Sequence, residues 1–137
     1  MLGPMPATHP TVIADARPSG PPDLRGTSCT ACGHRAFPAQ DLGCERCGAH
    51  GGALRPAALS GTGTVGAAAT VHRHDGPGIA AGFTALAVVL DDGPLVHALL
   101  AADAGRPRPG TRVAAVVAAT DGGGGVVEVR FVPGGAR

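Results

Sequence analysis

Four cysteines form two closely spaced pairs, and each pair is followed by a glycine. The pairs are Cys29-Thr-Ala-Cys32-Gly33 and Cys44-Glu-Arg-Cys47-Gly48, with eleven residues between them. Thiolates at this spacing can point at one centre, and two facing pairs supply the tetrahedral sulfur cage that Zn²⁺ prefers. A glycine suits the tight turn that follows each second cysteine. The spacing therefore predicts a structural zinc ribbon with all four sulfurs on the metal and no open position for a catalytic water.

Two other uses of the cysteines must be weighed. An even number of cysteines also permits disulfides, but residues 1–10 show no secretory signal, so we expect reduced thiols and a cytoplasmic protein. A redox pair would need a reactive cysteine at a helix start in a βαβ unit, for which the sequence gives no sign. His34 and His50 lie beside the pairs, and we expect them to be solvated neighbours because four thiolates complete the metal's shell.

The composition argues against binding to nucleic acid or to a membrane. The 137 residues include eleven basic and ten acidic side chains, three Phe, and no Trp or Tyr. A protein that follows a phosphate backbone needs clustered positive charge, and one that binds single strands needs aromatic platforms. No apolar run approaches the length of a membrane span. A nucleic-acid-binding ribbon and barrel therefore remains only as the alternative function.

The chain divides into three segments. Residues 1–22 are rich in Pro, Gly, Thr and Ala and have no apolar periodicity, so we expect an irregular segment. Residues 23–58 hold the cysteines and form the zinc ribbon, which is small enough to need its metal for stability. Residues 59–137 form a second unit, made of short apolar runs broken by Gly, Asp and Pro.

The second unit is predicted to contain five strands and to make the chain mainly β. The runs are 63–73, 83–90, 95–101, 112–119 and 127–131. In the first run, Val65, Ala67, Ala69 and Val71 are expected on one face. The fourth run is apolar throughout its centre, as for a strand covered on both sides. Five short strands in a glycine-rich chain favour a small barrel, most commonly the OB-fold.

The order of motifs resembles one known family. The matching pieces, all within residues 24–133, are the two cysteine pairs, Ala36-Phe37-Pro38, Leu59-Ser-Gly-Thr-Gly-Thr-Val65, Thr70-Val-His-Arg73, Val88-Val-Leu-Asp-Asp-Gly93, Pro109-Gly-Thr-Arg-Val113 and Phe131-Val-Pro133. This order is similar to that of the proteins that join a rubredoxin-like zinc ribbon to an acyl-CoA-associated OB-fold, known as domain of unknown function 35. The chain departs from the family in its Pro- and Gly-rich residues 1–22 and at Ala39-Gln40, where a basic residue is common.

The resemblance implies a non-catalytic accessory subunit in a hetero-oligomer with a thiolase-like enzyme of lipid or polyketide metabolism. Such subunits shape the partner's acyl-CoA site or bridge it to a second acyl-CoA enzyme, so a CoA thioester is expected at the partner interface. The residues expected to contact CoA or the partner are His72, Arg73, Phe83, Arg106 and Arg108.

The remaining polar residues do not suggest an enzyme. The three serines lack a Gly-x-Ser-x-Gly context, and no nucleophile–base pair is recognisable. Asp91 and Asp92 are adjacent, so we expect a solvated turn with the two carboxylates on opposite faces. His97 alternates with apolar residues and is expected to be a half-buried structural histidine.

Overall fold

The structure is a computed structural model, and it describes residues 20–73, 82–101, 104–119 and 127–134. The predicted irregular segment 1–22 lies almost entirely outside these ranges. Within them the chain is built from strands, and its one helical element is the short 3-10 turn η1 (Gly51–Ala53). No helix of the described chain is long and apolar enough to cross a membrane. The mainly β class expected from the sequence is confirmed.

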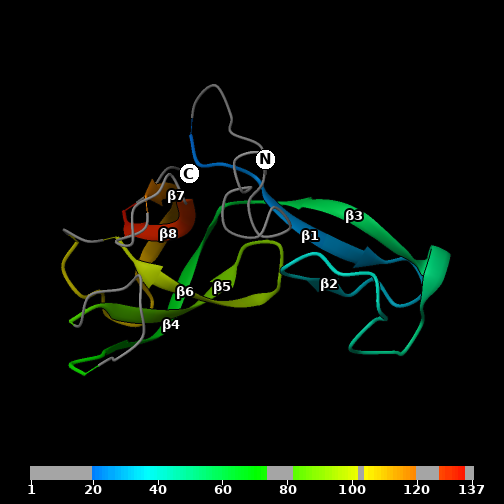
Figure 1. Ribbon diagram of the computed structural model, residues 1–137, viewed down its shortest axis with the longest axis horizontal. Helices are drawn as coiled ribbons and strands as arrows, with labels where there is room; N and C mark the ends of the chain where they lie inside the picture. The colour runs from blue at the N-terminus through cyan, green and yellow to red at the C-terminus, as the bar shows by residue number, and fades with distance from the viewer. Residues whose placement is uncertain (1–19, 74–81, 102–103, 120–126, 135–137) are drawn as a thin grey trace, which may run out of the picture.

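The first sheet contains three antiparallel strands and carries the cysteines. The strands are β1 (Leu24–Cys29), β2 (Arg35–Ala36) and β3 (Leu54–Leu59), in the order β2-β1-β3. Leu24 pairs with Leu59 at one end of the β1–β3 ladder, and Cys29 pairs with Leu54 at the other. Figure 1 shows this sheet as a long arm that extends from the rest of the molecule. The cysteines therefore lie at the far end of the arm.

The second sheet is a closed five-stranded barrel. Its strands are β4 (Thr62–Thr70), β5 (Thr84–Leu90), β6 (Leu95–Leu100), β7 (Arg112–Ala119) and β8 (Val127–Pro133). The order around the barrel is β4-β5-β6-β8-β7, with β7 closing on β4 and only β6–β8 parallel. This is the strand order of an OB-fold, and the predicted barrel is confirmed.

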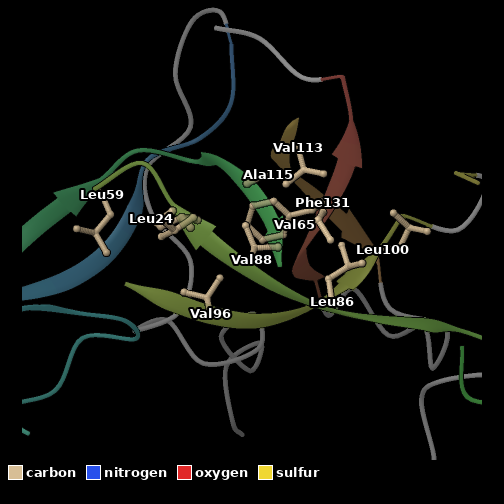
Figure 2. Packing of buried hydrophobic residues seen from close by; sticks show 11 residues of the cluster. Leu24, Leu59, Val65, Leu86, Val88, Val96, Leu100, Val113, Ala115 and Phe131 are labelled. Atoms are coloured by element: carbon tan, nitrogen blue, oxygen red, sulfur yellow. The ribbon is translucent and has the colours of Figure 1, made fainter. Parts of the chain in front are cut away.

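One hydrophobic core joins the two sheets. Leu86, Val88 and Leu90 alternate along β5 and point into the barrel, where Phe131 is also buried. Leu24 and Leu59, at the near end of the arm, are fully buried and belong to the same cluster (Figure 2). The base of the ribbon therefore forms part of the barrel's core.

The first barrel strand differs from the sequence prediction. Val65 pairs with Val88, but Ala67 pairs with Ala87, so Gly66 forms a bulge. A bulge adds one residue and reverses the alternation beyond it. Val65 is buried as expected, whereas Ala67 and Ala69 are exposed and Ala68 packs against the core. The prediction of one continuous face through Ala67 and Ala69 was wrong.

The fourth and fifth barrel strands depart less from expectation. Along β7, residues Val113, Ala114 and Ala115 are buried as expected for a strand covered on both sides, but Val117 is 47% exposed. Along β8, Val129 and Phe131 face the core, and Arg130 is also buried.

Candidate functional site

The two cysteine pairs fold into two turns with the same backbone geometry. The Gly33 N–H donates to the Cys29 carbonyl (2.8 Å), and the Gly48 N–H donates to the Cys44 carbonyl (2.9 Å). Gly33 and Gly48 have φ angles of 81° and 82°, which a side chain would strain. The repeated sequence thus produces a repeated turn that directs both sulfurs of a pair to one side.

Gln40 holds the loop that precedes the second cysteine pair against strand β1. Its side-chain amide donates to the Gly43 carbonyl (2.6 Å), and its side-chain oxygen accepts from the Leu42 N–H (2.7 Å). Its backbone N–H donates to the Thr27 hydroxyl on β1 (3.0 Å), and its backbone carbonyl accepts from that hydroxyl. In the sequence, Gln40 stands out only as part of a departure from the family pattern. Its hydrogen-bond partners could not be predicted, because they depend on how the loop folds back onto β1.

The four sulfur atoms form one compact cluster. All four lie within 4.8 Å of one another, with 3.7 Å from Cys29 Sγ to Cys47 Sγ and from Cys32 Sγ to Cys44 Sγ. A tetrahedron with metal–sulfur bonds of ~2.3 Å has sulfur–sulfur edges of about 3.8 Å. Both 3.7 Å distances join a cysteine of one pair to a cysteine of the other, as in a shared metal site. The donor set and its spacing therefore fit a metal ion such as zinc.

The local electrostatics favour a cation among the sulfurs. The backbone N–H groups of Cys47 and Arg46 lower the pKa of the Cys44 thiol to about 6. The backbone N–H of His34 favours the Cys32 thiolate, but loss of hydration and the neighbouring thiols outweigh it and raise the pKa of Cys32 to about 11. The neighbouring thiols thus favour ionisation of Cys44 but oppose ionisation of Cys32, so the four do not readily ionise together. A bound cation would remove this conflict and let all four ionise.

The two neighbouring histidines are not part of the cluster. His34 Nε2 lies 2.8 Å from Glu45 Oε1, and His50 is an exposed residue that precedes η1. Within the described chain, the candidate metal-ligating group contains only the four cysteines. This arrangement agrees with the expectation that both histidines are neighbours of the site.

The Asp91-Asp92 turn connects the barrel to the ribbon. Asp91 accepts two hydrogen bonds from the Arg112 guanidinium (2.6 and 2.8 Å) and one from the Thr62 hydroxyl, which together lower its pKa to about 2. Asp92 accepts from the Ser60 N–H (3.0 Å) and lies 3.5 Å from the Arg35 guanidinium on β2. The expected turn is present and Asp91 is exposed in it, but both carboxylates also bind residues distant in sequence, which the sequence did not predict.

Three of the predicted contact residues gather at one end of the barrel. His72 and Arg73 are exposed just after β4, and Phe83 is half-buried just before β5. The Val71 N–H donates to the Phe83 carbonyl (2.8 Å), which places Phe83 next to the end of β4. The structure therefore brings these three residues together.

The two predicted arginines flank β4 further along. The exposed Arg106 donates to the Ala68 carbonyl (3.1 Å), and Arg108 is exposed in the turn closed by the Thr111 N–H. Their segment runs beside β4, since the Gly110 N–H donates to the Val65 carbonyl (2.7 Å). Their roles remain predictions.

Among the comparisons with known proteins, the comparison with solved structures supports the fold. No family model matches the sequence, and no curated protein matches it. Among solved structures, a chain of the Ltp2-ChsH2(DUF35) aldolase superimposes with a TM-score of 0.64 and 20% sequence identity, covering 81% of this chain and 84% of that chain. At this identity the similarity establishes the fold. This chain therefore has the fold of that DUF35 protein, a cysteine ribbon joined to a five-stranded barrel, and the resemblance predicted from the motifs is confirmed at the level of fold.

Proposed function

We propose that this chain is a non-catalytic accessory subunit that binds a thiolase-like enzyme in a hetero-oligomer. The observation that carries the proposal is the fold shared over 81% of the chain with a protein named as a DUF35 aldolase component. The partner would run the chemistry on an acyl-CoA thioester in the cytoplasm. This chain would complete the partner's acyl-CoA site or connect it to a second acyl-CoA enzyme.

The metal is proposed to be a structural zinc ion. Four thiolates close the coordination shell of Zn²⁺ and leave no position for a substrate or water. Cys29, Cys32, Cys44 and Cys47 would all be ligands, so none would remain as a nucleophile. The metal's part in this proposal is to crosslink the two turns at the far end of the arm.

The polar residues support an accessory role. The adjacent carboxylates of Asp91 and Asp92 are engaged with Arg112, Thr62 and Ser60 inside the chain. The residues proposed to contact CoA or the partner are those predicted from the sequence, His72, Arg73, Phe83, Arg106 and Arg108. All five lie at or beside β4, on the surface of the barrel or at its end.

Complex formation tests this function. Thiolase-like enzymes encoded in the same genome are purified individually, mixed with the full chain, and analysed by size-exclusion chromatography with light scattering. We expect one of them to co-elute with the chain at a fixed stoichiometry. A chain that elutes alone in every mixture would contradict the proposal. So would a chain that cleaves or condenses acyl-CoA thioesters without a partner.

A further inference from the structure

The outward face of β4, β5 and β6 is unusually apolar for a barrel surface. Cross-strand pairing arranges it in three rows: Thr64, Val89 and Leu95; Ala67, Ala87 and His97; Ala69, Ala85 and Leu99. We call these nine residues the outer face. The strands lie side by side in Figure 1. In an antiparallel sheet with one face on the core, the other face is normally polar, but seven of these nine side chains are apolar.

Five of the nine residues of the outer face are exposed and the other four, Thr64, Ala85, Ala87 and Leu99, are half-buried. Val89 is 45% exposed and Leu95 54% exposed, and they are direct cross-strand partners. Ala67 and Ala69 are exposed because of the bulge at Gly66. Neighbouring rows of exposed and half-buried apolar residues can mark a surface that another molecule covers. The alanines also leave room for a partner to approach the strands closely.

His97 is the single titratable residue of the outer face. The sequence predicted a half-buried structural histidine, but the side chain is exposed at the centre of β6. The prediction was wrong because Val96 and Ala98, on either side, are the residues of β6 that point into the barrel. The outer face thus carries no fixed charge.

The border of the outer face is basic along β4. Two described segments flank this strand, residues 71–73 at its end and 104–111 at its side, as the hydrogen bonds to Ala68 and Val65 show. These two segments contain Arg73, Arg106 and Arg108 and no acidic residue, and all three arginines are exposed. At the opposite end, the charge of Arg112 is balanced by Asp91.

The basic border favours a different protein over a second copy of the chain as the partner of the outer face. Two copies of the chain packed through this face would place basic borders around one interface, where like charges repel. A different protein with an uncharged apolar centre and carboxylates at its edge would bury the apolar rows and meet the arginines.

We propose that the outer face is the docking surface for the enzyme subunit, and that the matching patch on that subunit is apolar at its centre and acidic beside Arg106 and Arg108. The identity of the partner rests on the proposed function, whereas the surface is argued from the barrel itself. Small apolar residues at the centre would give shape complementarity, and the arginines would orient the encounter.

Charged substitutions on the outer face test this inference. The test variants, made in the full chain, are Val89→Glu and Leu95→Glu. The control variants are Val117→Glu on β7 and Leu42→Glu on the ribbon, which replace apolar residues that are 47% and 87% exposed outside the outer face. Affinity is measured by biolayer interferometry against each purified thiolase-like enzyme of the same genome. A charge buried without a partner is costly, so we expect about 100-fold weaker binding for the two face variants. The two control variants should bind within about twofold of the wild type.

The folding of the variants and the protection of the outer face are measured separately. Circular dichroism and thermal unfolding should show that all four variants fold, because each replaced side chain is exposed. Hydrogen exchange of the unsubstituted chain should slow at residues 85–89 and 95–99 when the enzyme binds. If one variant fails to fold, the other variant and the exchange data still decide the question.

The results distinguish an incorrect docking surface from an incorrect function. If the wild type binds an enzyme and both face variants bind equally well, the outer face is the wrong surface while the accessory function stands. If the wild type binds none of the enzymes, the proposed function fails and this partner fails with it. A homodimer that Leu95→Glu dissociates would also overturn the proposal, by showing that the occupant is a second copy.

Discussion

The four sulfur atoms of the cysteine cluster lie within 4.8 Å of one another, and among the described residues the candidate metal-ligating group contains no other side chain. Replacing Cys32 by Ser should therefore abolish metal binding, because an un-ionised hydroxyl is a poor ligand for zinc. We expect the metal content to fall from about one zinc ion per chain to a small fraction, as measured by inductively coupled plasma mass spectrometry.

His34→Ala is the matched control for this substitution. His34 contacts Glu45 and lies outside the cluster, so its removal should leave the metal content unchanged. Loss of the metal from this variant, or full retention by Cys32→Ser, would contradict the assignment of the ligands.

Asp91 should make the fold more sensitive to acid. Its pKa is lowered to about 2 by hydrogen bonds from Arg112 and Thr62, so its ionised form stabilises the folded state. This contribution is complete above the unfolded pKa near 3.8 and is lost as the pH falls towards 2. Asp91→Asn should lower the melting temperature at pH 7 by about 3 °C, a modest effect because the pair is screened by solvent.

The pH dependence separates this effect from loss of the metal. Acid protonates the thiols of both proteins alike, so the informative quantity is the difference in melting temperature between wild type and Asp91→Asn. We expect that difference to be constant from pH 7 to about 5 and to shrink below pH 4. A difference that does not change with pH would show that Asp91 does not contribute through its charge.

At the scale of the strand, Gly63 lets β4 and β5 approach closely. A Cβ added at Gly63 would lie 2.4 Å from the Val89 carbonyl oxygen and 2.9 Å from the Val88 side chain. Gly63→Ala should therefore lower the free energy of unfolding by about 2 kcal/mol, measured by urea denaturation. Gly66→Ala is the control, because its Cβ would meet its nearest neighbour, the Ala87 carbonyl oxygen, at 3.6 Å. Equal stability of the two variants would refute the packing argument.

Local patterns predicted much of this architecture. The strand expected over 112–119 has those same limits in the structure, because a Pro-Gly turn and a glycine run bound its apolar residues. The cysteine cluster is also local, since all four cysteines lie within residues 29–47.

Other features depend on contacts that no local pattern contains. The bulge at Gly66 cannot be distinguished from regular alternation without the pairing of β4 with β5. The hydrogen bonds of Asp92 with Ser60 and Arg35 connect residues that are 32 and 57 positions apart in the sequence. The apolar outer face likewise becomes visible only when three strands are placed in register.

At the scale of the molecule, the ribbon is held at both ends by different interactions. Leu24 and Leu59 anchor its base in the barrel core, and the proposed zinc holds its far end. A chelator should therefore free the far end first. We expect amide exchange to accelerate at Gly33 and Gly48 and to remain slow along β5, as measured by hydrogen exchange with mass spectrometry. Uniform acceleration across both sheets would instead indicate that ribbon and barrel unfold as one unit.

We propose above that this chain supports the catalysis of another enzyme and performs none itself. The most direct test measures the acyl-CoA thioester turnover of the co-eluting thiolase-like enzyme while the chain is added in increasing amounts. We expect activity to rise with added chain and to reach a plateau at the stoichiometry of the complex, while the chain alone has no activity. Full activity of the enzyme without the chain, unchanged by its addition, would contradict the proposed function.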